Sequence, residues 1–473
     1  MIELRDYQDD LVSRIRNAMR ENRRVLGVAP TGAGKTVMFS YIAFNAAMRN
    51  RRAIIVAHRR EIVDQISTAL SKFDLRHGRI QPGHSMTGDP VQVAMVQTIA
   101  KRMHLIREPD LLVIDEAHHA VAGQWSKVAA AWPNARILGV TATPERLDGR
   151  GLGDAFDALV EGPATADLIQ RGFLADFEYF APPPSADFSG IATRAGDYAI
   201  DQLAAAMDKA TVTGDAVEHY RRHLQGAPAI AFCVTVAHAE HVAEQFRQAG
   251  FRAASVDGKL DAGERARRVA AIGTGELQIL TSCELVSEGF DVPAVAGAIL
   301  LRRTKSLSLY LQQVGRCLRL KADGSRAVIL DHVGNVNLHG SPKTPRVWTL
   351  DAKKRKQREA GVRQCKVCYQ VFDAGASGEC ENRANPECLF TSVVREVPSL
   401  DLPQAVAGEL VAAEDRPAWA GGIDILRASG PEWRALLGRA RTREQLQEIA
   451  RARGYKPGWV HHILATRGQA VAA

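Results

Sequence analysis

The sequence predicts an α/β fold with two parallel-sheet domains in tandem, followed by a small cysteine-containing module and a helical tail. Short aliphatic and β-branched runs alternate with amphipathic stretches, which is typical of βαβ units whose sheet is covered by helices on both faces. This alternation starts a second time after residue 220. The chain of 473 residues is also too long for one ordinary core, which favours two or three domains.

The expected strands fall into two groups. The first group is Val25–Val28, Ala53–Val56, Val91–Met95, Leu111–Ile114 and Ile137–Val140. The second group is Ala229–Cys233, Ala253–Val256, Leu277–Leu280, Ala298–Leu301 and Ala327–Leu330. Between strands, segments such as Arg60–Phe73 carry apolar residues at helical spacing and are expected to be helices.

These patterns divide the chain into six segments. We expect a first domain over 1–175, a partly helical connection over 176–220, a second domain over 221–350, a basic linker over 351–364, a cysteine module over 365–390 and a helical region over 391–473. Pro182–Pro184 predicts extended chain within the connection. The basic run Asp351–Arg358 suits a solvated linker or an arm that follows phosphates.

The composition indicates a packed protein without membrane spans. Apolar residues make up 46% and charged residues 24%, and no apolar run approaches the ~20 residues that span a bilayer. The N-terminus lacks a signal pattern, so we expect a cytoplasmic protein whose seven cysteines are packing residues or metal ligands. The net charge of +8 suits a polyanionic partner, although a basic surface without a function would also explain it.

A phosphate-binding loop is predicted directly after the first expected strand. It is Ala29-Pro30-Thr31-Gly32-Ala33-Gly34-Lys35-Thr36, with Ala29 where a glycine usually stands. Gly32 and Gly34 allow backbone amides to face phosphates at the start of a helix. Lys35 would neutralise the β- and γ-phosphates of ATP, and Thr36 would bind Mg²⁺. Taken alone, the motif is also compatible with a glycine-rich turn that binds nothing.

Two carboxylates end another buried strand, in Leu111-Leu112-Val113-Ile114-Asp115-Glu116-Ala117-His118. Ligands bind at the carboxyl ends of strands in open α/β sheets, so Asp115 and Glu116 are expected beside the phosphate-binding loop. Asp115 would hold Mg²⁺ and Glu116 would polarise the attacking water. The two motifs together predict ATP hydrolysis.

Asp115-Glu116-Ala117-His118 resembles the DEAH box of the superfamily 2 helicases, whose other motifs follow in order over roughly residues 4–335. The resemblance implies two RecA-like domains that close around ATP and move along a nucleic acid. Leu4-Arg5-Asp6-Tyr7-Gln8 resembles the motif that binds adenine, with Gln8 paired to the base and Arg5 stacked on it. Thr141-Ala142-Thr143-Pro144 resembles the motif that couples the ATP site to the nucleic-acid groove.

The second domain carries two further motifs of the same superfamily. Thr281–Pro293 resembles motif V, which implies that Gly289 and Asp291 face the nucleotide. Gln312–Arg319 resembles motif VI, which implies catalytic roles for Gln312, Arg316 and Arg319. Arg316 and Arg319 are one helical turn apart, so we expect them to share a helix face and reach the γ-phosphate.

The resemblance also implies a nucleic-acid groove that crosses both domains. The expected contacts are His58, Arg59, Thr98, Thr235 and Thr281. Side chains of this kind at strand ends suit phosphate contacts, which position a strand without reading its sequence. Threonine also caps helices, which is the alternative role for each of the three threonines.

Four of the seven cysteines lie close together in the sequence, as Cys365, Cys368, Cys380 and Cys388. A CxxC pair with two later thiols in a polar segment predicts a structural Zn²⁺ site with four thiolate ligands. The wide spacing of the last two departs from a second CxxC. A redox-active dithiol and simple packing remain alternatives.

The order of helicase core, cysteine cluster and basic tail resembles the RadD-type bacterial DNA-repair ATPases and their phage relatives. Asp331–Asn335 and Arg453–Trp459 add to this resemblance. It implies a monomeric, nucleoid-associated ATPase that moves on single-stranded or branched DNA and acts with repair or recombination proteins. An ATP-timed DNA clamp that stimulates a partner and an RNA helicase are the alternatives. In the tail, Tyr455 and Trp459 would either stack on bases or pack a helical cap.

Overall fold

A computed structural model describes most of the chain. The described residues are 3–119, 123–146, 151–181, 188, 190–207, 210–283, 295–351, 362–365, 367–372, 380, 388, 393–396, 430–440, 442–453, 455, 459–460 and 463–464. Two compact units are present, 1–400 and 401–473, and each is described by itself. No helix in the described part of the chain is both long enough and apolar enough to cross a bilayer.

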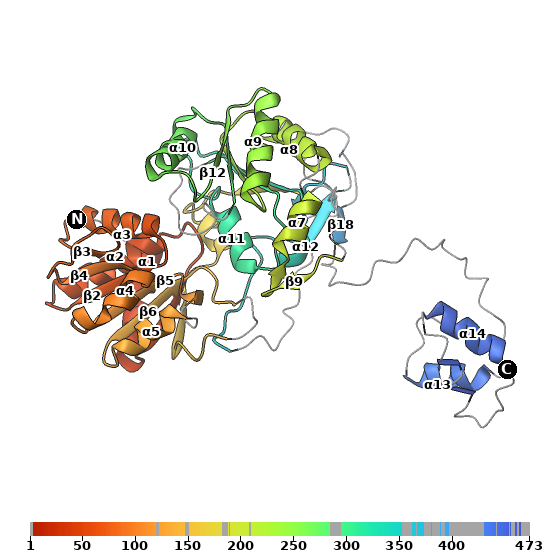
Figure 1. Cartoon of the computed structure of the whole chain (residues 1–473), viewed down its shortest axis with the longest axis horizontal. Coiled ribbons are helices and arrows are strands. Elements are labelled where there is room, and N and C mark those ends of the chain that lie inside the picture. The colour runs from red at the N-terminus through yellow and green to blue at the C-terminus, as the bar shows by residue number, and fades with distance from the viewer. Residues whose placement is uncertain are drawn as a thin grey trace. The chain divides into compact units, whose positions relative to one another are not determined.

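The first domain is a seven-stranded parallel sheet with helices on both faces (Figure 1). Its strands lie in the order β3-β4-β2-β5-β6-β1-β7. They are β1 (Arg24–Val28), β2 (Ala53–Ala57), β3 (Gly78–Ile80), β4 (Val91–Met95), β5 (Leu111–Asp115), β6 (Arg136–Thr141) and β7 (Ala158–Glu161). The helices are α1 (Asp6–Glu21), α2 (Lys35–Ala47), α3 (Arg60–Lys72), α4 (Val96–Arg102), α5 (Gln124–Ala131) and α6 (Thr165–Gln170), with short 3-10 helices at Met103–Leu105 and Ala117–His119.

Successive side chains of each central strand pack into cores on opposite faces of this sheet. In β1, Val25 packs with the residues of α1, α2 and α3, whereas Leu26 packs with those of α4 and α5. Strands buried on both faces need apolar residues at every position, because alternate side chains point to opposite faces. This explains the unbroken aliphatic runs of β2 and β5.

The second domain is a six-stranded parallel sheet in the order β12-β13-β11-β14-β15-β8. Its strands are β8 (Phe177–Phe180), β11 (Ala229–Phe232), β12 (Ala253–Val256), β13 (Ile279–Ser282), β14 (Gly297–Leu300) and β15 (Ala327–Asp331). Its helices are α7 (Ile200–Met207), α8 (Ala210–His223), α9 (Val236–Gln248), α10 (Ala262–Thr274), α11 (Leu307–Gly315) and α12 (Asn335–His339). A hairpin of β9 (Thr193–Arg194) and β10 (Asp197–Tyr198) precedes α7.

The sequence predicted the two-sheet architecture, which is confirmed, but it assigned 176–220 to a connection. Strand β8 lies within that segment and pairs in parallel with β15, from Phe177 opposite Ala327 to Phe180 opposite Leu330. The strand is short and interrupted by the partly exposed Glu178, so its apolar pattern is weak. Prolines 182–184, which suggested a stiff linker, lie outside the described residues.

A three-stranded antiparallel sheet carries the cysteine module, in the order β17-β16-β18. Its strands are β16 (Val362–Cys365), β17 (Val371–Phe372) and β18 (Val393–Glu396). Gln370 forms an antiparallel bridge with Phe180 of β8, and the Ala181 amide donates to the Tyr369 carbonyl at 3.1 Å. Backbone pairing therefore attaches the module to the edge strand of the second domain.

The C-terminal unit contains α13 (Gly430–Arg439) and α14 (Arg443–Ala452), within the region expected to be helical. Its core includes Leu436, Leu446, Ile449 and Val460. Trp433 and Trp459 are partly buried and pack against this core. The unit is therefore built around its own small apolar centre.

Candidate nucleotide and nucleic-acid sites

The phosphate-binding loop joins β1 to α2, and its two glycines have conformations that other residues rarely adopt. Gly32 has a φ of +87° and Gly34 a φ of +78°. A Cβ at Gly34 would lie 2.5 Å from Gln8 Nε2, and one at Gly32 would lie 2.9 Å from Leu174 Cδ2. Backbone conformation and close packing thus both require glycine at these positions.

Ala29 replaces the usual first glycine without difficulty. Its amide extends the β1 ladder by donating to the Thr141 carbonyl at 3.1 Å, so the loop starts in ordinary strand geometry. Lys35 Nζ donates to the carbonyls of Ala29 and Pro30, at 3.2 and 3.3 Å. Desolvation lowers the pKa of Lys35, whereas Glu116 and Asp115 oppose that shift. The loop therefore presents its lysine beside the two carboxylates.

Asp115 and Glu116 end β5 and are both buried. Burial, and then repulsion by Glu116, raise the pKa of Asp115 to about 7. Two adjacent buried carboxylates need a cation to remain charged together, which fits a divalent ion beside the loop lysine. Glu116 Oε2 has no hydrogen-bond partner among the described residues.

His118 connects this carboxylate pair to the Thr141–Thr143 motif. Its Nδ1 lies 3.5 Å from Glu116 Oε2 and 3.2 Å from Thr141 Oγ1. The Thr141 hydroxyl also donates to the Thr143 carbonyl at 3.0 Å. The two motifs are therefore joined through side chains at the ends of neighbouring strands β5 and β6.

The amide of Gln8 bonds to the chain itself, although the sequence suggested that it would pair with adenine. Its Nε2 donates to the Ala33 carbonyl at 3.0 Å, and its Oε1 accepts from the Arg5 amide at 3.0 Å. The Tyr7 hydroxyl donates to the same Ala33 carbonyl at 2.9 Å. The Gln8 side chain thus links the start of α1 to the phosphate-binding loop.

Arg171 and Phe173, which the sequence did not single out, lie beside this motif. The Tyr7 and Phe173 ring centroids are 4.8 Å apart, and the Arg5 guanidinium lies 5.2 Å from the Phe173 centroid. The Arg171 guanidinium also lies 5.2 Å from Phe173, and it pairs with Asp6 at 2.5 Å. These residues lie far from Tyr7 in the sequence, so no local pattern could reveal them.

The second domain approaches the phosphate-binding loop through the end of α11. A Cβ on Gly315 would lie 2.5 Å from Thr31 Cβ, so only glycine allows this approach. Arg316 follows directly, is buried, and acts on the pKa of Lys35 as a nearby positive charge. Gln312 is 3% exposed, and its Nε2 has no hydrogen-bond partner in the described part of the chain.

The expected common helix face for Arg316 and Arg319 is wrong. Helix α11 ends at Gly315, and Arg316 is its C-cap residue. Arg319 lies in the turn beyond and is partly exposed, whereas Arg316 is buried. The helix therefore ends before both arginines. Gly289 and Asp291 lie outside the described residues.

Known proteins share both halves of this arrangement. Residues 1–146 match the family model of the type III restriction enzyme res subunit, and residues 212–321 match that of the helicase conserved C-terminal domain. A "51.5 kDa protein" of Lactococcus phage (isolate 7-9) is 33% identical over 342 residues, which cover 72% of this chain and 73% of the phage protein. The chain belongs to the superfamily 2 helicases. It is an ATP-hydrolysing enzyme, as the ATP-dependent relatives of this superfamily are.

Two further similarities concern larger proteins. The "Putative ATP-dependent helicase IRC3" of Saccharomyces cerevisiae is 30% identical over 355 residues, and the match spans 70% of this chain and 51% of the yeast protein. The chain thus spans about half the length of that relative. The structure of the ATP-dependent Type ISP restriction-modification enzyme LlaBIII bound to DNA has a TM-score of 0.54 at 16% identity, covering 70% of this chain and 28% of that one. This last similarity concerns the fold alone.

The groove residues expected for the helicase differ in their surroundings. The His58 carbonyl accepts from Gln97 Nε2 at 3.2 Å, which joins the segment around His58 to the one that carries Thr98. The His58 ring nitrogen accepts from Arg59 Nε at 3.1 Å. Thr235 caps α9 by accepting from the His238 amide at 3.1 Å. Thr281 is fully buried and donates to the Ala239 carbonyl at 2.7 Å, and Thr98 is 8% exposed. Thr235 and Thr281 thus hydrogen-bond within the second domain, and the Thr98 side chain is buried.

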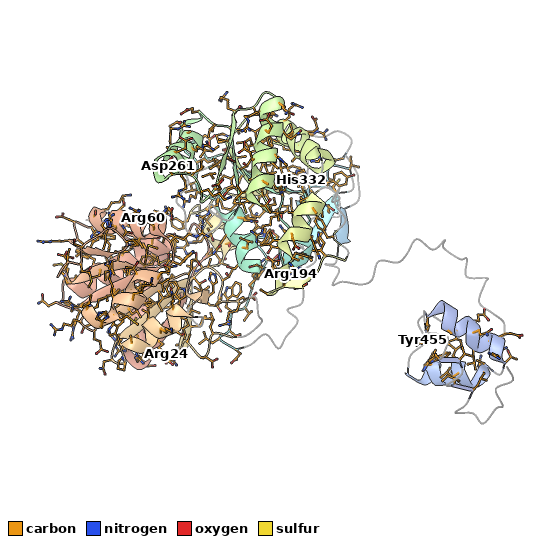
Figure 2. The ribbon with its side chains drawn as sticks, in the orientation of Figure 1. Arg24, Arg60, Arg194, Asp261, His332 and Tyr455 are labelled. Carbon is orange, nitrogen blue, oxygen red and sulfur yellow. The ribbon has the colours of Figure 1, made fainter. Side chains whose placement is uncertain are left out.

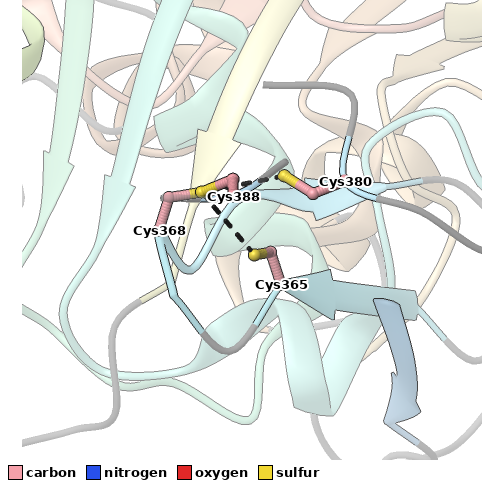
Figure 3. Close-up of side chains that lie close together, drawn as sticks. All are labelled: Cys365, Cys368, Cys380 and Cys388. Carbon is pink, nitrogen blue, oxygen red and sulfur yellow. Dashed lines mark hydrogen bonds between the residues drawn. The ribbon is translucent and has the colours of Figure 1, made fainter. Parts of the chain in front are cut away.

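The four cysteines that the sequence suggested as zinc ligands lie close together in the structure (Figure 3). Their four sulfur atoms lie within 4.8 Å of one another. The Cys365–Cys388 and Cys368–Cys380 Sγ distances are 4.0 and 3.7 Å, far too long for disulfides. A tetrahedral Zn²⁺ with bonds of about 2.3 Å requires sulfur separations of about 3.8 Å. The Val367 amide donates to Cys365 Sγ at 3.4 Å. The donor set therefore fits a zinc ion.

Proposed function

We propose that this helicase is a DNA-stimulated ATPase that moves along, or remodels, DNA in repair or recombination. The observation that carries the proposal is the approach of Gly315 to Thr31, which brings Arg316 towards Lys35 and the carboxylate pair. An ATP site shared by two domains converts hydrolysis into domain movement, because binding favours closure and product release favours opening. Alternating grip on a strand then produces steps.

The residues of the site account for hydrolysis of the γ-phosphate. Lys35 and an Mg²⁺ ion held by Thr36 and Asp115 would neutralise the phosphate oxygens. Glu116 would accept a proton from water as the water oxygen bonds to the γ-phosphorus and the bond to ADP breaks. Arg316 is the better placed of the two arginines to stabilise the charge that develops, because it is buried beside Lys35.

DNA, rather than RNA, is supported by the resemblance of the helicase core, cysteine cluster and basic tail to the RadD-type DNA-repair ATPases. The net charge of +8 suits either polymer. We further propose that Cys365, Cys368, Cys380 and Cys388 hold one structural Zn²⁺. The sulfur separations support the ion, and the small apolar content of the module gives it a role in folding.

The test compares ATPase rates with single-stranded DNA, duplex DNA and RNA, each supplied separately. We expect single-stranded or branched DNA to stimulate the rate most, and Lys35→Ala to abolish it with every polymer. Stimulation by RNA alone would make the protein an RNA helicase. A second assay follows ATP-driven displacement of a protein bound to the DNA track. DNA binding that depends on ATP without any displacement would instead indicate a clamp.

A further inference from the structure

We propose that the C-terminal unit is a second nucleic-acid site, which stacks the bases of a single strand on the rings of Trp433, Tyr455 and Trp459. The three rings are termed the aromatic cluster below. This site goes beyond the proposed ATP-driven movement and does not require it. It would hold a strand independently of the nucleotide bound by the two RecA-like domains.

Charge is the first observation that supports the proposal. Residues 430–473 contain eight arginines and lysines against three glutamates, a net charge of +5. The whole chain has a net charge of +8, so most of the excess belongs to its last 44 residues. A short basic segment of this kind suits a polyphosphate backbone, whose binding releases condensed counterions.

The aromatic cluster supplies the second observation. The Tyr455 and Trp459 centroids lie 4.8 Å apart with 40° between the rings, and Trp433 lies 6.2 Å from Trp459 and 6.3 Å from Tyr455. Leu436, Leu446 and Ile449 are fully buried beneath the cluster and form the core of the unit. The two tryptophans are only partly buried against that core, and Tyr455 remains 37% exposed. Figure 2 labels Tyr455 within the C-terminal unit.

The cluster is held in place and is accompanied by a cation. The Tyr455 amide donates to the Ala450 carbonyl at 2.9 Å, which ties the main chain of Tyr455 to the end of α14. The Arg453 guanidinium lies 4.2 Å from the Trp433 centroid, within cation–π distance. Partly exposed rings beside arginine are the features that bind unpaired bases without reading their sequence. Duplex DNA hides its base faces, so the chemistry favours a single strand.

Binding to an acidic peptide is the main alternative, because such a peptide would also be attracted by the positive charge. It would have less use for exposed aromatic rings, on which single bases can stack. The experiment must therefore separate ring stacking from charge attraction.

The probe is a fluorescein-labelled oligo-dT bound to the full chain without nucleotide, with affinity measured by anisotropy. We expect Tyr455→Ala and Arg453→Gln each to weaken binding about fivefold or more, the factor expected when one stacked base is lost. Tyr455→Phe keeps the ring and should bind as the wild type does. Arg221→Gln is the matched control, because it removes another cation–aromatic pair, with Phe251, in the second domain.

ATPase measurements add a second readout, which separates DNA binding at the aromatic cluster from catalysis at the ATP site. The basal rate and the maximal DNA-stimulated rate should stay unchanged in Tyr455→Ala, while the DNA concentration for half-maximal stimulation rises. Circular dichroism and thermal melting check that each variant is folded. If folded Tyr455→Ala and Arg453→Gln both bind oligo-dT like the wild type, the proposal is wrong.

Two further outcomes have distinct meanings. If these variants weaken binding of a labelled acidic peptide but leave oligo-dT binding unchanged, the unit is a protein-docking site and the proposal fails. If no nucleic acid stimulates ATP hydrolysis while the variants still weaken oligo-dT binding, the second site stands and the proposed DNA-driven motor is wrong.

Discussion

Glu116, at the predicted ATP site, combines a strained backbone conformation with a buried carboxylate. Glu116 is not glycine, yet it has a φ of +48°, which costs on the order of 1–3 kcal/mol. Its carboxylate is buried next to that of Asp115. The structure sustains this cost because β5 lies at the centre of the sheet, where the strands on both sides hold its end in place. Such strain is typical of positions that serve chemistry.

Glu116→Gln should therefore trap ATP without hydrolysing it. The amide keeps the shape of the side chain but cannot accept the proton of the attacking water. We expect turnover to fall by ~10²-fold or more while ATP still binds, measured by single-turnover hydrolysis and by binding of a fluorescent ATP analogue. Wild-type turnover in Glu116→Gln would place the base elsewhere.

A group of neighbouring histidines in the second domain predicts a dependence of stability on pH. His332 follows β15 and lies 5.1 Å from His219, while His223 lies 4.0 Å from Phe180, centroid to centroid. Burial first, and then the neighbouring histidines, lower the pKa of His332 to about 3 and that of His223 to about 4. Below pH 6.5 the unfolded chain thus binds protons that the folded domain does not. The contribution of these histidines to the free energy of unfolding is fully present above pH 6.5 and is lost as the pH drops towards 4.

His332→Gln should flatten this fall, because one of the shifted groups is removed. The measurement is the midpoint of thermal unfolding between pH 7.5 and 4. His241→Gln, at an exposed position of α9, is the matched control and should keep the wild-type pH dependence. An identical pH dependence for His332→Gln and wild type would show that these histidines do not govern acid stability.

At the scale of elements, the cysteine module covers a sheet edge. Strand β8 is the last strand of the second sheet, and its free side would otherwise expose unpaired backbone groups. The Phe180–Gln370 bridge and a hydrogen bond from Gln364 Nε2 to the Ala181 carbonyl occupy this edge. The module is thus a part of the second domain rather than a separate finger.

Replacing Cys365 and Cys368 by serine should release the zinc and loosen the module from β8. We expect metal analysis to fall from one zinc per chain to none, with a lower thermal midpoint and more aggregation, because an edge strand becomes exposed. Basal ATPase should persist, since the RecA-like cores do not depend on the metal. Cys233→Ala, which changes a cysteine outside the cluster, is the control and should retain one zinc per chain. Wild-type protein purified without zinc, in the absence of chelator, would contradict the site.

At the scale of the molecule, the two RecA-like domains are joined by more than the ATP site. The chain returns to the first domain after α12, where the Leu152 and Gly153 amides donate to the Leu350 carbonyl at 2.8 and 2.9 Å. The Trp348 amide donates to Glu161 at 3.2 Å. Glu61 of α3 also pairs with Arg265 of α10 at 2.9 Å, and their side chains are 22% and 14% exposed. This pair connects helices of different domains.

Glu61→Gln or Arg265→Gln should reduce DNA-stimulated ATPase by about three- to tenfold, because each leaves a partly buried charge without its partner. The charge-swapped pair Glu61→Arg with Arg265→Glu should recover much of that loss. Arg267→Gln, an exposed position on the same helix, should have little effect. If the charge-swapped protein instead loses as much activity as the two single changes added together, the pair does not couple the domains.

Local patterns in the sequence were sufficient to predict the buried strands and the glycine positions of the phosphate-binding loop. Central parallel strands need aliphatic residues on both faces, and a loop at a helix start needs positive φ at particular positions. The four-cysteine cluster was also predictable, because cysteines gather in one short segment without an aliphatic core. The weaker edge strand β8 escaped, since its local composition resembles a connection.

Only the tertiary structure decided the contacts between segments distant in the chain. The approach of Gly315 to Thr31, the hydrogen bonds from Tyr7 and Gln8 to Ala33, and the contact between the Phe173 and Tyr7 rings all depend on how separate elements pack. Spacing along the sequence carries no information about such distances. Helix α11 likewise ends at Gly315, before both arginines, and leaves Arg316 buried and Arg319 partly exposed. Motif order thus predicted the candidate residues of the ATP site, whereas packing determined which of them are brought together.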